Sequence, residues 1–260
     1  MIAHSSARLP GSARLPWLRQ LTNAIVDLLY PPHCAVCHSL GSWLCIRCIA
    51  QIERIHPPVC LRCGRPVGPE VNFAATAQEP GPLCGRCEEL PPDLDLLRAF
   101  AYFGGPLREA IHQFKYGGVA VLAGPLGQMM ACAWPNLAPD GQEQVDVIVP
   151  VPLHPRRERE RGYNQAALLA REFGPRLGCP VVEDALLRPR ETLPQVNLGT
   201  RERRANVHGA FRCADSRLRG SRVLIIDDVF TTGATLEAAA SALRLGGASA
   251  VLGYTLARAK

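Results

Sequence analysis

Two adjacent acids followed by a threonine-rich turn form the segment of this sequence best suited to chemistry on a sugar phosphate. The acids come directly after the apolar run 223–226, and the turn is built from small residues and includes a glycine. Small residues where a helix begins let main-chain N–H groups and hydroxyls surround a phosphate, which the helix dipole also favours. Carboxylates at the end of a strand can accept hydrogen bonds from ribose hydroxyls. The expected ligand-binding residues are Asp227, Asp228, Thr231, Thr232, Gly233, Ala234 and Thr235. Acid pairs after strands also cap helices or bind metals, so this segment alone leaves those uses open.

Eight of the eleven cysteines form four Cys-x-x-Cys pairs within 54 residues. Two residues between cysteines let both thiolates face one ion, and two such turns complete a tetrahedral set of four sulfurs. We therefore predict two structural zinc ions, with sequential pairing as the simplest arrangement and crossed pairing left open. An iron–sulfur cluster could use the same ligands, but this turn-rich, all-cysteine pattern favours zinc. The eight cysteines are Cys34, Cys37, Cys45, Cys48, Cys60, Cys63, Cys84 and Cys87.

The segment that carries these pairs has too few apolar residues to build a core of its own. Metal affinity would then supply its folding free energy. The other three cysteines, Cys132, Cys179 and Cys213, are isolated in the sequence and are expected to behave as small apolar residues.

Strand and helix patterns alternate after residue 92 and would position the phosphate segment. We expect strands at 96–103, 145–149, 223–226 and 250–256, and helices at 106–115, 121–133, 163–177 and 234–245. Strands that are apolar throughout and separated by amphipathic helices imply a parallel sheet covered on both faces. The fold class expected is therefore α/β, with a doubly wound, mainly parallel sheet behind a small Cys-rich module.

Three regions follow from these patterns. Residues 1–29 would be a tail with an amphipathic helix at 17–29, residues 30–91 a double zinc ribbon, and residues 92–260 the α/β domain. No apolar run approaches the ~20 residues that cross a bilayer, and the first residues lack an export signal. We expect a cytoplasmic protein, where thiols stay reduced. The formal net charge of +6, mostly from arginine, makes an anionic partner plausible.

The segment 223–235 resembles the signature of type I phosphoribosyltransferases, and several further segments resemble the ComF family. The cysteine pairs match that family's double zinc ribbon, and the likeness runs from about Leu28 to the end of the chain. The further segments are VPVPLHP at 149–155, the arginine cluster with GYNQ at 156–165, FKYGG at 114–118, and the stretches 188–195 and 201–211.

This resemblance implies a type I phosphoribosyltransferase fold that binds phosphoribosyl pyrophosphate (PRPP), with Mg²⁺ held mainly by the pyrophosphate and by water. It also implies that the loop after Val149 holds the pyrophosphate and that residues 188–204 form a loop over the site. A triply phosphorylated sugar needs cations beyond a helix dipole. The candidates for the pyrophosphate and the covering loop are Pro150, Val151, Lys115, Arg161, Arg201 and Arg204.

The family likeness further implies a role in competence and DNA uptake, with single-stranded DNA and other DNA-uptake proteins as partners. Aromatic side chains beside basic residues could stack on bases, and the candidates are Tyr102, Phe103, Tyr116 and Tyr163. Two alternatives stay open: a phosphoribosyltransferase with an unidentified acceptor, and a zinc-ribbon adaptor with a relic PRPP site. No catalytic residue is assigned, because Thr231 stands where 6-oxopurine salvage enzymes carry an aspartate.

Overall fold

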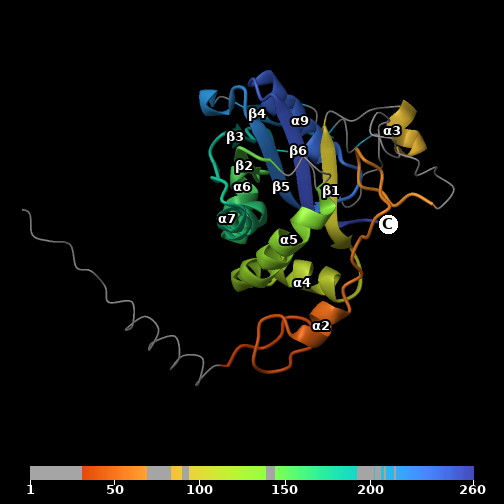
Figure 1. The fold of residues 1–260 in the computed structure, drawn as a ribbon. Helices are drawn as coiled ribbons and strands as arrows, with labels where there is room; N and C mark the ends of the chain where they lie inside the picture. Colours follow the sequence, from red (N-terminus) through yellow and green to blue (C-terminus); the bar gives the residue numbers. More distant parts are fainter. Residues whose placement is uncertain are drawn as a thin grey trace, which may run out of the picture.

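The computed structural model describes residues 31–68, 83–89, 94–138, 144–191, 202, 206–207, 209–213 and 215–260. The helix expected at 17–29 lies outside these residues. The described chain forms a helix-covered sheet with a Cys-rich segment along one edge (Figure 1). None of the described helices has the length and apolar character to cross a membrane.

Four parallel strands form the central sheet in the order β1 (Leu96–Tyr102), β6 (Ala250–Arg258), β5 (Arg222–Phe230) and β2 (Val147–Pro150). All three neighbouring pairs run parallel, as expected from strands that are apolar on both faces. Parallel strands share one carboxyl edge, which brings the end of β2 beside the second half of β5. The adjacent residues Asp227 and Asp228, here called the twin acids, lie in that half of β5.

Each face of the sheet packs on helices, which confirms the doubly wound arrangement. One core joins β5 residues Leu224 and Ile226 to helices α4 (Gly105–Tyr116), α5 (Ala123–Leu137) and α7 (Gln165–Leu177). The other core joins Val223 and Ile225 to α9 (Ala234–Leu245) (Figure 1). Because successive residues of a strand point to opposite faces, the run 223–226 of β5 must be apolar at every position to serve both cores.

Most observed bounds lie within two residues of the expected ones, and three differences are larger. Helix α9 has the expected bounds, whereas α5 continues to Leu137 because Trp134 and Leu137 extend its buried stripe past residue 133. Strand β5 continues to Phe230, four residues beyond the expected end, because β6 remains paired with it. The twin acids therefore lie within β5. The antiparallel pair β3 (Leu186–Leu187) and β4 (Arg212–Cys213) was not expected, since two-residue strands carry no periodic pattern.

Short elements complete the described chain. These are α2 (Ile46–Ala50) and α3 (Gly85–Glu89) in the Cys-rich segment, the 3₁₀ turns η1 (Ala120–Leu122) and η3 (Ser216–Leu218), and α6 (Pro155–Arg161) after β2.

The linker between the two halves of the Cys-rich segment pairs with the edge of the sheet. The main-chain N–H of Ile55 donates to Phe100 at 3.3 Å, and that of Tyr102 donates to Glu53 at 2.9 Å. Arg54 and Ala101 thus form an antiparallel bridge on β1. This pairing covers the exposed edge of β1, which would otherwise offer unpaired main-chain groups.

Candidate functional site

Two clusters of four cysteines occupy the described part of the Cys-rich segment, and their sulfur atoms lie within 4.8 Å of one another in each cluster. Cys34, Cys37, Cys45 and Cys48 form the first cluster, and Cys60, Cys63, Cys84 and Cys87 form the second. The pairs are thus grouped sequentially. Burial raises the pKa of the Cys87 thiol to about 11, so a cation is needed to hold such a sulfur as thiolate. Four convergent sulfurs fit tetrahedral Zn²⁺, and these are two Cys₄ zinc-binding sites.

One of the twin acids of β5 forms an ion pair with a lysine at the end of α4. Lys115, on the last turn of α4, places its Nζ 2.6 Å from Oδ1 of Asp228. The two side chains are 18% and 13% exposed, so the ion pair is largely shielded from water. The main-chain N–H of Asp228 donates to Oδ1 of Asp227 at 2.8 Å. The structure therefore brings together three of the residues expected at the site.

Asp227 is the member of this group whose carboxyl pKa is raised by its surroundings. Burial, with the neighbouring Asp228 carboxylate as the next cause, raises its pKa to about 7, while Lys115 opposes the shift. A carboxyl group with this pKa changes its protonation state near neutral pH. Its proton or a hydrogen-bonding ligand such as a ribose hydroxyl can therefore relieve the cost of holding it beside Asp228.

The turn after β5 is shaped by Gly233. This residue has φ +87° and is the N-cap of α9, so it provides no capping side chain. A Cβ atom there would lie 2.7 Å from Cε2 of Phe230, closer than two carbon atoms can approach. Thr232 lies beside it, with its hydroxyl 3.5 Å from the N–H of Ala234. Helix α9 therefore begins at the carboxyl edge of the sheet, and the positive end of its dipole lies there.

Pro150 and Val151, two of the expected pyrophosphate residues, have no main-chain donor to offer a ligand. Proline lacks an N–H, and the N–H of Val151 donates to Ile226 at 2.9 Å. Both are buried. Their backbone instead fixes where the loop 152–154 leaves the sheet, at the edge where the twin acids lie.

The GYNQ segment ties that loop to the end of α4. Asn164 caps α7 by accepting from Ala166 at 3.0 Å and donates to the carbonyl of Val151 at 3.0 Å. The Tyr163 hydroxyl and the Gln165 amide both donate to the carbonyl of Phe114, at 2.7 and 3.4 Å. Lys115 follows Phe114 directly, so this network helps set the position of the lysine that pairs with Asp228.

Arg161 joins the same network. It donates to Oε1 of Gln165 at 3.0 Å, and its guanidinium carbon lies 5.1 Å from the centre of the Tyr116 ring. Arg201 and Arg204 lie outside the described residues.

Arg188 is a cation near the acids that sequence reasoning did not select. It is 7% exposed and lies against the Phe211 ring at 5.2 Å. Burial, with a smaller contribution from Arg157, lowers its pKa to about 10, whereas the charge of Asp227 favours its protonated form. The β3–β4 pair holds it there. Its position at the start of the expected covering loop was the only available signal.

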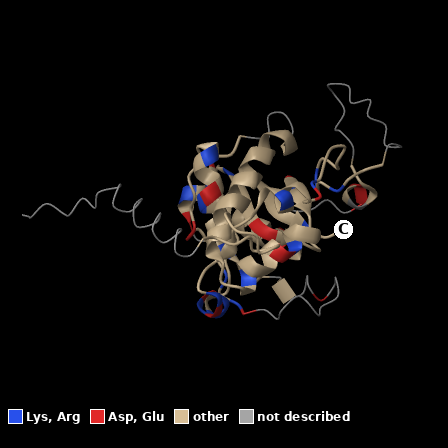
Figure 2. Cartoon of the chain, turned by 90° about the horizontal axis from the view of Figure 1, so that it is seen from below, with Lys and Arg blue, Asp and Glu red and all other residues tan. Residues whose placement is uncertain are grey.

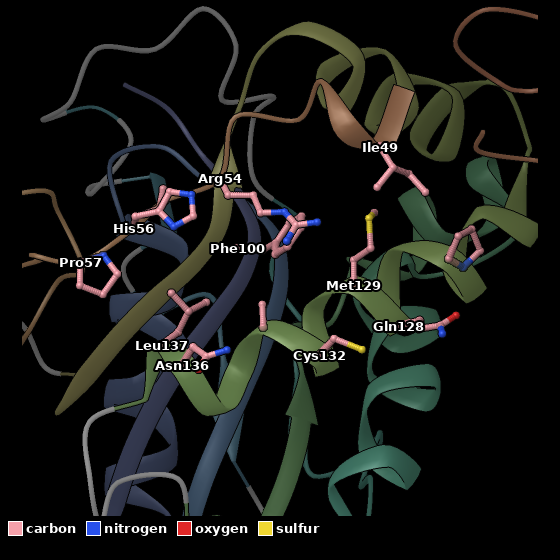
Figure 3. Close-up of a pocket in the computed structure, with 13 residues that line it drawn as sticks. Ile49, Arg54, His56, Pro57, Phe100, Gln128, Met129, Cys132, Asn136 and Leu137 are labelled. Carbon is pink, nitrogen blue, oxygen red and sulfur yellow. The ribbon is translucent and has the colours of Figure 1, made fainter. Parts of the chain in front are cut away.

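A cavity of about 360 Å³ adjoins the end of β2, and its lining includes Pro150, Asn164 and Arg188. A larger cavity of about 410 Å³ lies between the ribbon linker, β1 and α5, and Figure 3 shows Arg54 beside Phe100 within it. None of the residues lining the larger cavity belongs to the turn after β5. No residue lining the smaller cavity belongs to that turn either, but its lining includes Pro150 at the end of β2 and the buried Arg188.

Three large apolar side chains of the segment that carries the first cysteine cluster are exposed. Leu40, Trp43 and Ile46 are 65%, 40% and 75% exposed, and Arg47 is exposed beside them. Basic and acidic residues are interspersed along the described chain (Figure 2). Of the four aromatics expected to stack on bases, Tyr116 is exposed, and the other three are partly buried.

Both parts of the chain match known protein families. Residues 25–88 match the family model of a double zinc ribbon domain, and residues 141–260 match that of a phosphoribosyl transferase domain. The sheet is accordingly of the phosphoribosyltransferase kind.

Similar proteins extend over most of the chain. DNA utilization protein YhgH of Escherichia coli K12 is 33% identical over 89% of this chain and 99% of its own length. Competence protein F of Haemophilus influenzae is 31% identical over 85% and 93%. Competence protein ComFC of Bacillus subtilis is 28% identical over 83% and 84%. A solved glutamine PRPP amidotransferase from B. subtilis has a TM-score of 0.35 at 20% identity, over 53% of this chain and 26% of that one.

Proposed function

The chain belongs to the ComF family of competence and DNA-utilization proteins, and from that premise we propose that it binds PRPP with Mg²⁺ and handles single-stranded DNA on the cytoplasmic side. The phosphoribosyl transferase match supports the first ligand, and the names of the relatives support the second.

The observation that carries PRPP binding is the placement of Asp227 and Asp228 beside the Gly233 turn, with Lys115 paired to Asp228. In the proposed complex, the two carboxylates accept hydrogen bonds from the ribose hydroxyls. The 5′-phosphate occupies the turn at the start of α9, where a helix N-terminus favours an anion. Asp227 gains hydrogen-bond donors in place of a proton, which offsets the cost of holding its charge partly buried beside Asp228.

The pyrophosphate would lie over the end of β2, beside the 360 Å³ cavity. Arg188 and Lys115 are the described cations suited to its charge, because both are already held near the twin acids. Mg²⁺ would be bound by the pyrophosphate and by water, since hydrated Mg²⁺ commonly binds through substrate phosphates.

Single-stranded DNA would contact the exposed face of the first zinc ribbon. Trp43 offers a ring for base stacking, which contributes about 1–3 kcal/mol per base, and Arg47 lies four residues further along the chain. Leu40 and Ile46 leave further apolar surface exposed on this small module, and exposed apolar patches are a feature of contact surfaces.

Binding of a labelled oligothymidine, followed by fluorescence anisotropy at several salt concentrations, tests this surface. We expect Trp43→Ala to weaken binding about tenfold at every salt concentration, by loss of one stacked base. Arg47→Ala should reduce the slope of log affinity against log salt by about 0.7, the value for one phosphate contact on a single strand. Leu245→Ala removes an even more exposed apolar side chain from α9, remote in sequence, and serves as the control. Equal affinities for all three variants and the parent would reject the surface.

A phosphoribosyltransferase with an unidentified acceptor is the second candidate, and the match to the phosphoribosyl transferase domain favours it. Such a reaction needs leaving-group cations and a positioned nucleophile, and Lys115 and Arg188 would supply the cations. Release of pyrophosphate only when a nucleobase or amine acceptor is added would identify this activity. An adaptor with a relic site would neither bind PRPP nor release pyrophosphate.

A further inference from the structure

The second zinc site is held against the sheet by two buried arginines. Arg98 of β1, 2% exposed, donates to the carbonyls of Cys60 at 3.3 Å and Leu61 at 3.0 Å. Arg258 of β6, 5% exposed, donates to the carbonyl of the ligand Cys63 at 2.9 Å. Buried guanidinium groups require hydrogen-bond acceptors. The carbonyls of the zinc-binding turn supply them, and the two arginines in return hold that turn against the sheet.

Main-chain contacts reinforce this attachment. The N–H of Leu97 in β1 donates to the carbonyl of Arg62 at 2.6 Å. Gly64 has φ +63°, and a Cβ there would lie 2.6 Å from the carbonyl oxygen of Leu97. The turn that carries Cys60 and Cys63 therefore sits directly on the strand, and Figure 1 shows the C-terminal end of the chain beside it.

Arg258 also contacts Phe230, whose ring lies against the Gly233 turn proposed to bind the phosphate. Its guanidinium carbon lies 5.2 Å from the centre of the Phe230 ring. Phe230 pairs with Arg258 in the sheet register, and its carbonyl accepts from Ala259 at 2.8 Å. The edge of the same ring closes the space above Gly233, where a Cβ would be only 2.7 Å away. The ring thus has the arginine near it and the glycine turn against its edge.

We propose that the second zinc site positions the phosphate-binding turn through Arg258 and Phe230, so that zinc at this site and PRPP bind cooperatively. This inference rests on the proposed PRPP binding. Zinc fixes the Cys63 peptide, the Cys63 carbonyl orients the guanidinium, and the guanidinium fixes the ring that sets the shape of the Gly233 turn. Arg258 is a positioning residue, because it touches neither acid of the site in the described contacts.

The first zinc site offers a comparison within the same chain. It packs on the sheet core through apolar residues such as Leu44 and Ile52. Its linker carries Arg54, whose guanidinium carbon lies 5.6 Å from the centre of the Phe100 ring on β1. Arg54 therefore makes the same kind of ring contact as Arg258, but from an exposed position at the sheet edge and away from the Gly233 turn.

The test measures zinc withdrawal by a chromophoric chelator from the full-length protein with and without PRPP and Mg²⁺. We expect PRPP to slow the loss of one of the two zinc equivalents about tenfold, within the range typical of coupled sites, and to leave the other unchanged. Reciprocity applies to equilibrium affinities, so this zinc should strengthen PRPP binding by the factor by which PRPP raises the affinity of the site for zinc.

Arg258→Met removes both guanidinium contacts and keeps all eight cysteines. It should retain two zinc equivalents, bind PRPP about tenfold more weakly, and lose the effect of PRPP on zinc withdrawal. Arg54→Met, the matched control, should stay within twofold of the parent in both measurements. If Arg258→Met does not retain its zinc, Phe230→Leu keeps the Arg258 to Cys63 bond and should show the same loss of coupling.

The outcomes separate the two proposals. If the parent protein binds PRPP and both zinc equivalents leave at unchanged rates, the coupling is refuted while PRPP binding stands. The coupling is equally refuted if Arg258→Met binds PRPP as the parent does. If the parent does not bind PRPP at millimolar concentration, the proposed function itself fails, and the coupling with it.

Discussion

At the scale of single residues, Asp227 should cost the unliganded protein stability at neutral pH. Its pKa is raised from 3.8 to about 7 by burial first and by Asp228 second. A carboxyl whose pKa is higher in the folded state contributes stability below its unfolded pKa, and this contribution is lost as the pH rises through about 7. Asp227→Asn should therefore raise the free energy of unfolding by about 1–2 kcal/mol at pH 8. At pH 4 the gain should largely vanish.

Thermal unfolding of the two proteins at pH 4, 6 and 8 measures this difference. A gain that is the same at all three pH values would show that the Asp227 carboxylate is not the source. Residues that bind ligands commonly reduce stability in this way.

The ion pair between Lys115 and Asp228 makes a second prediction. Lys115→Met leaves the Asp228 carboxylate largely buried beside Asp227, and should lower the free energy of unfolding by about 2–3 kcal/mol. Adding Asp228→Asn should restore most of that loss, because the uncompensated charge is then gone.

Urea unfolding of the single and double variants gives these values. The control is Lys260→Met, which breaks the pair with Glu53 at 2.8 Å, where both side chains are more than half exposed. Its effect should be under about 1 kcal/mol. Equal losses for Lys115→Met and Lys260→Met would mean that the Asp228 pair is not shielded as its exposure suggests.

The twin acids and the cysteine pairs could be located from the sequence because their spacing is local and specific. Arg188, Arg98 and Arg258 could not be assigned roles, because each is held by groups that are distant in sequence. An arginine in a charged, Arg-rich chain usually lies on the surface, and only the folded chain places these three against aromatic rings and carbonyls.

At the scale of elements, the turn between β5 and α9 depends on Gly233. Gly233→Ala introduces a Cβ at positive φ and 2.7 Å from the Phe230 ring. The Phe230 ring or the backbone of the turn must then shift, and we expect a loss of about 2–3 kcal/mol in unfolding free energy together with loss of PRPP binding.

Gly220→Ala is the matched control, since Gly220 has φ +74° and no atom within 4 Å of the added Cβ. It should cost only about 1 kcal/mol, from the backbone conformation, and leave PRPP binding unchanged. Calorimetric binding and urea unfolding of both variants separate the contact from the conformation. If the two substitutions have equal effects, Phe230 does not restrict the turn.

Elements with a long, regular apolar pattern were predicted well. The end of β5 and the paired linker at 53–55 were not, because both depend on pairing with another strand. Helix α9 has ten or more residues of regular amphipathic pattern, so its bounds followed from the sequence. The end of β5 was wrong because strand length depends on β6, its partner. The paired linker at 53–55 was missed because three residues cannot show a period, and its pairing depends on the free edge of β1.

At the scale of the whole molecule, the Cys-rich segment is part of the same structure as the sheet. Its linker covers the edge of β1, and its second zinc turn contacts β1 and β6 through buried arginines. The class of the fold and the presence of two zinc sites could be predicted from patterning and cysteine spacing. How the zinc ribbon attaches to the sheet could not, because it depends on carbonyl groups that every residue carries.

Isothermal titration of the zinc-loaded protein with PRPP and Mg²⁺ measures whether the carboxyl edge of β5 binds PRPP. Asp227→Asn combined with Asp228→Asn should weaken binding about 100-fold, because two charged hydrogen-bond acceptors are lost. Ribose 5-phosphate, which lacks the pyrophosphate, should bind the parent more weakly than PRPP. No heat of binding from the parent protein at millimolar PRPP, or equal affinity in the doubly substituted variant, would contradict the account.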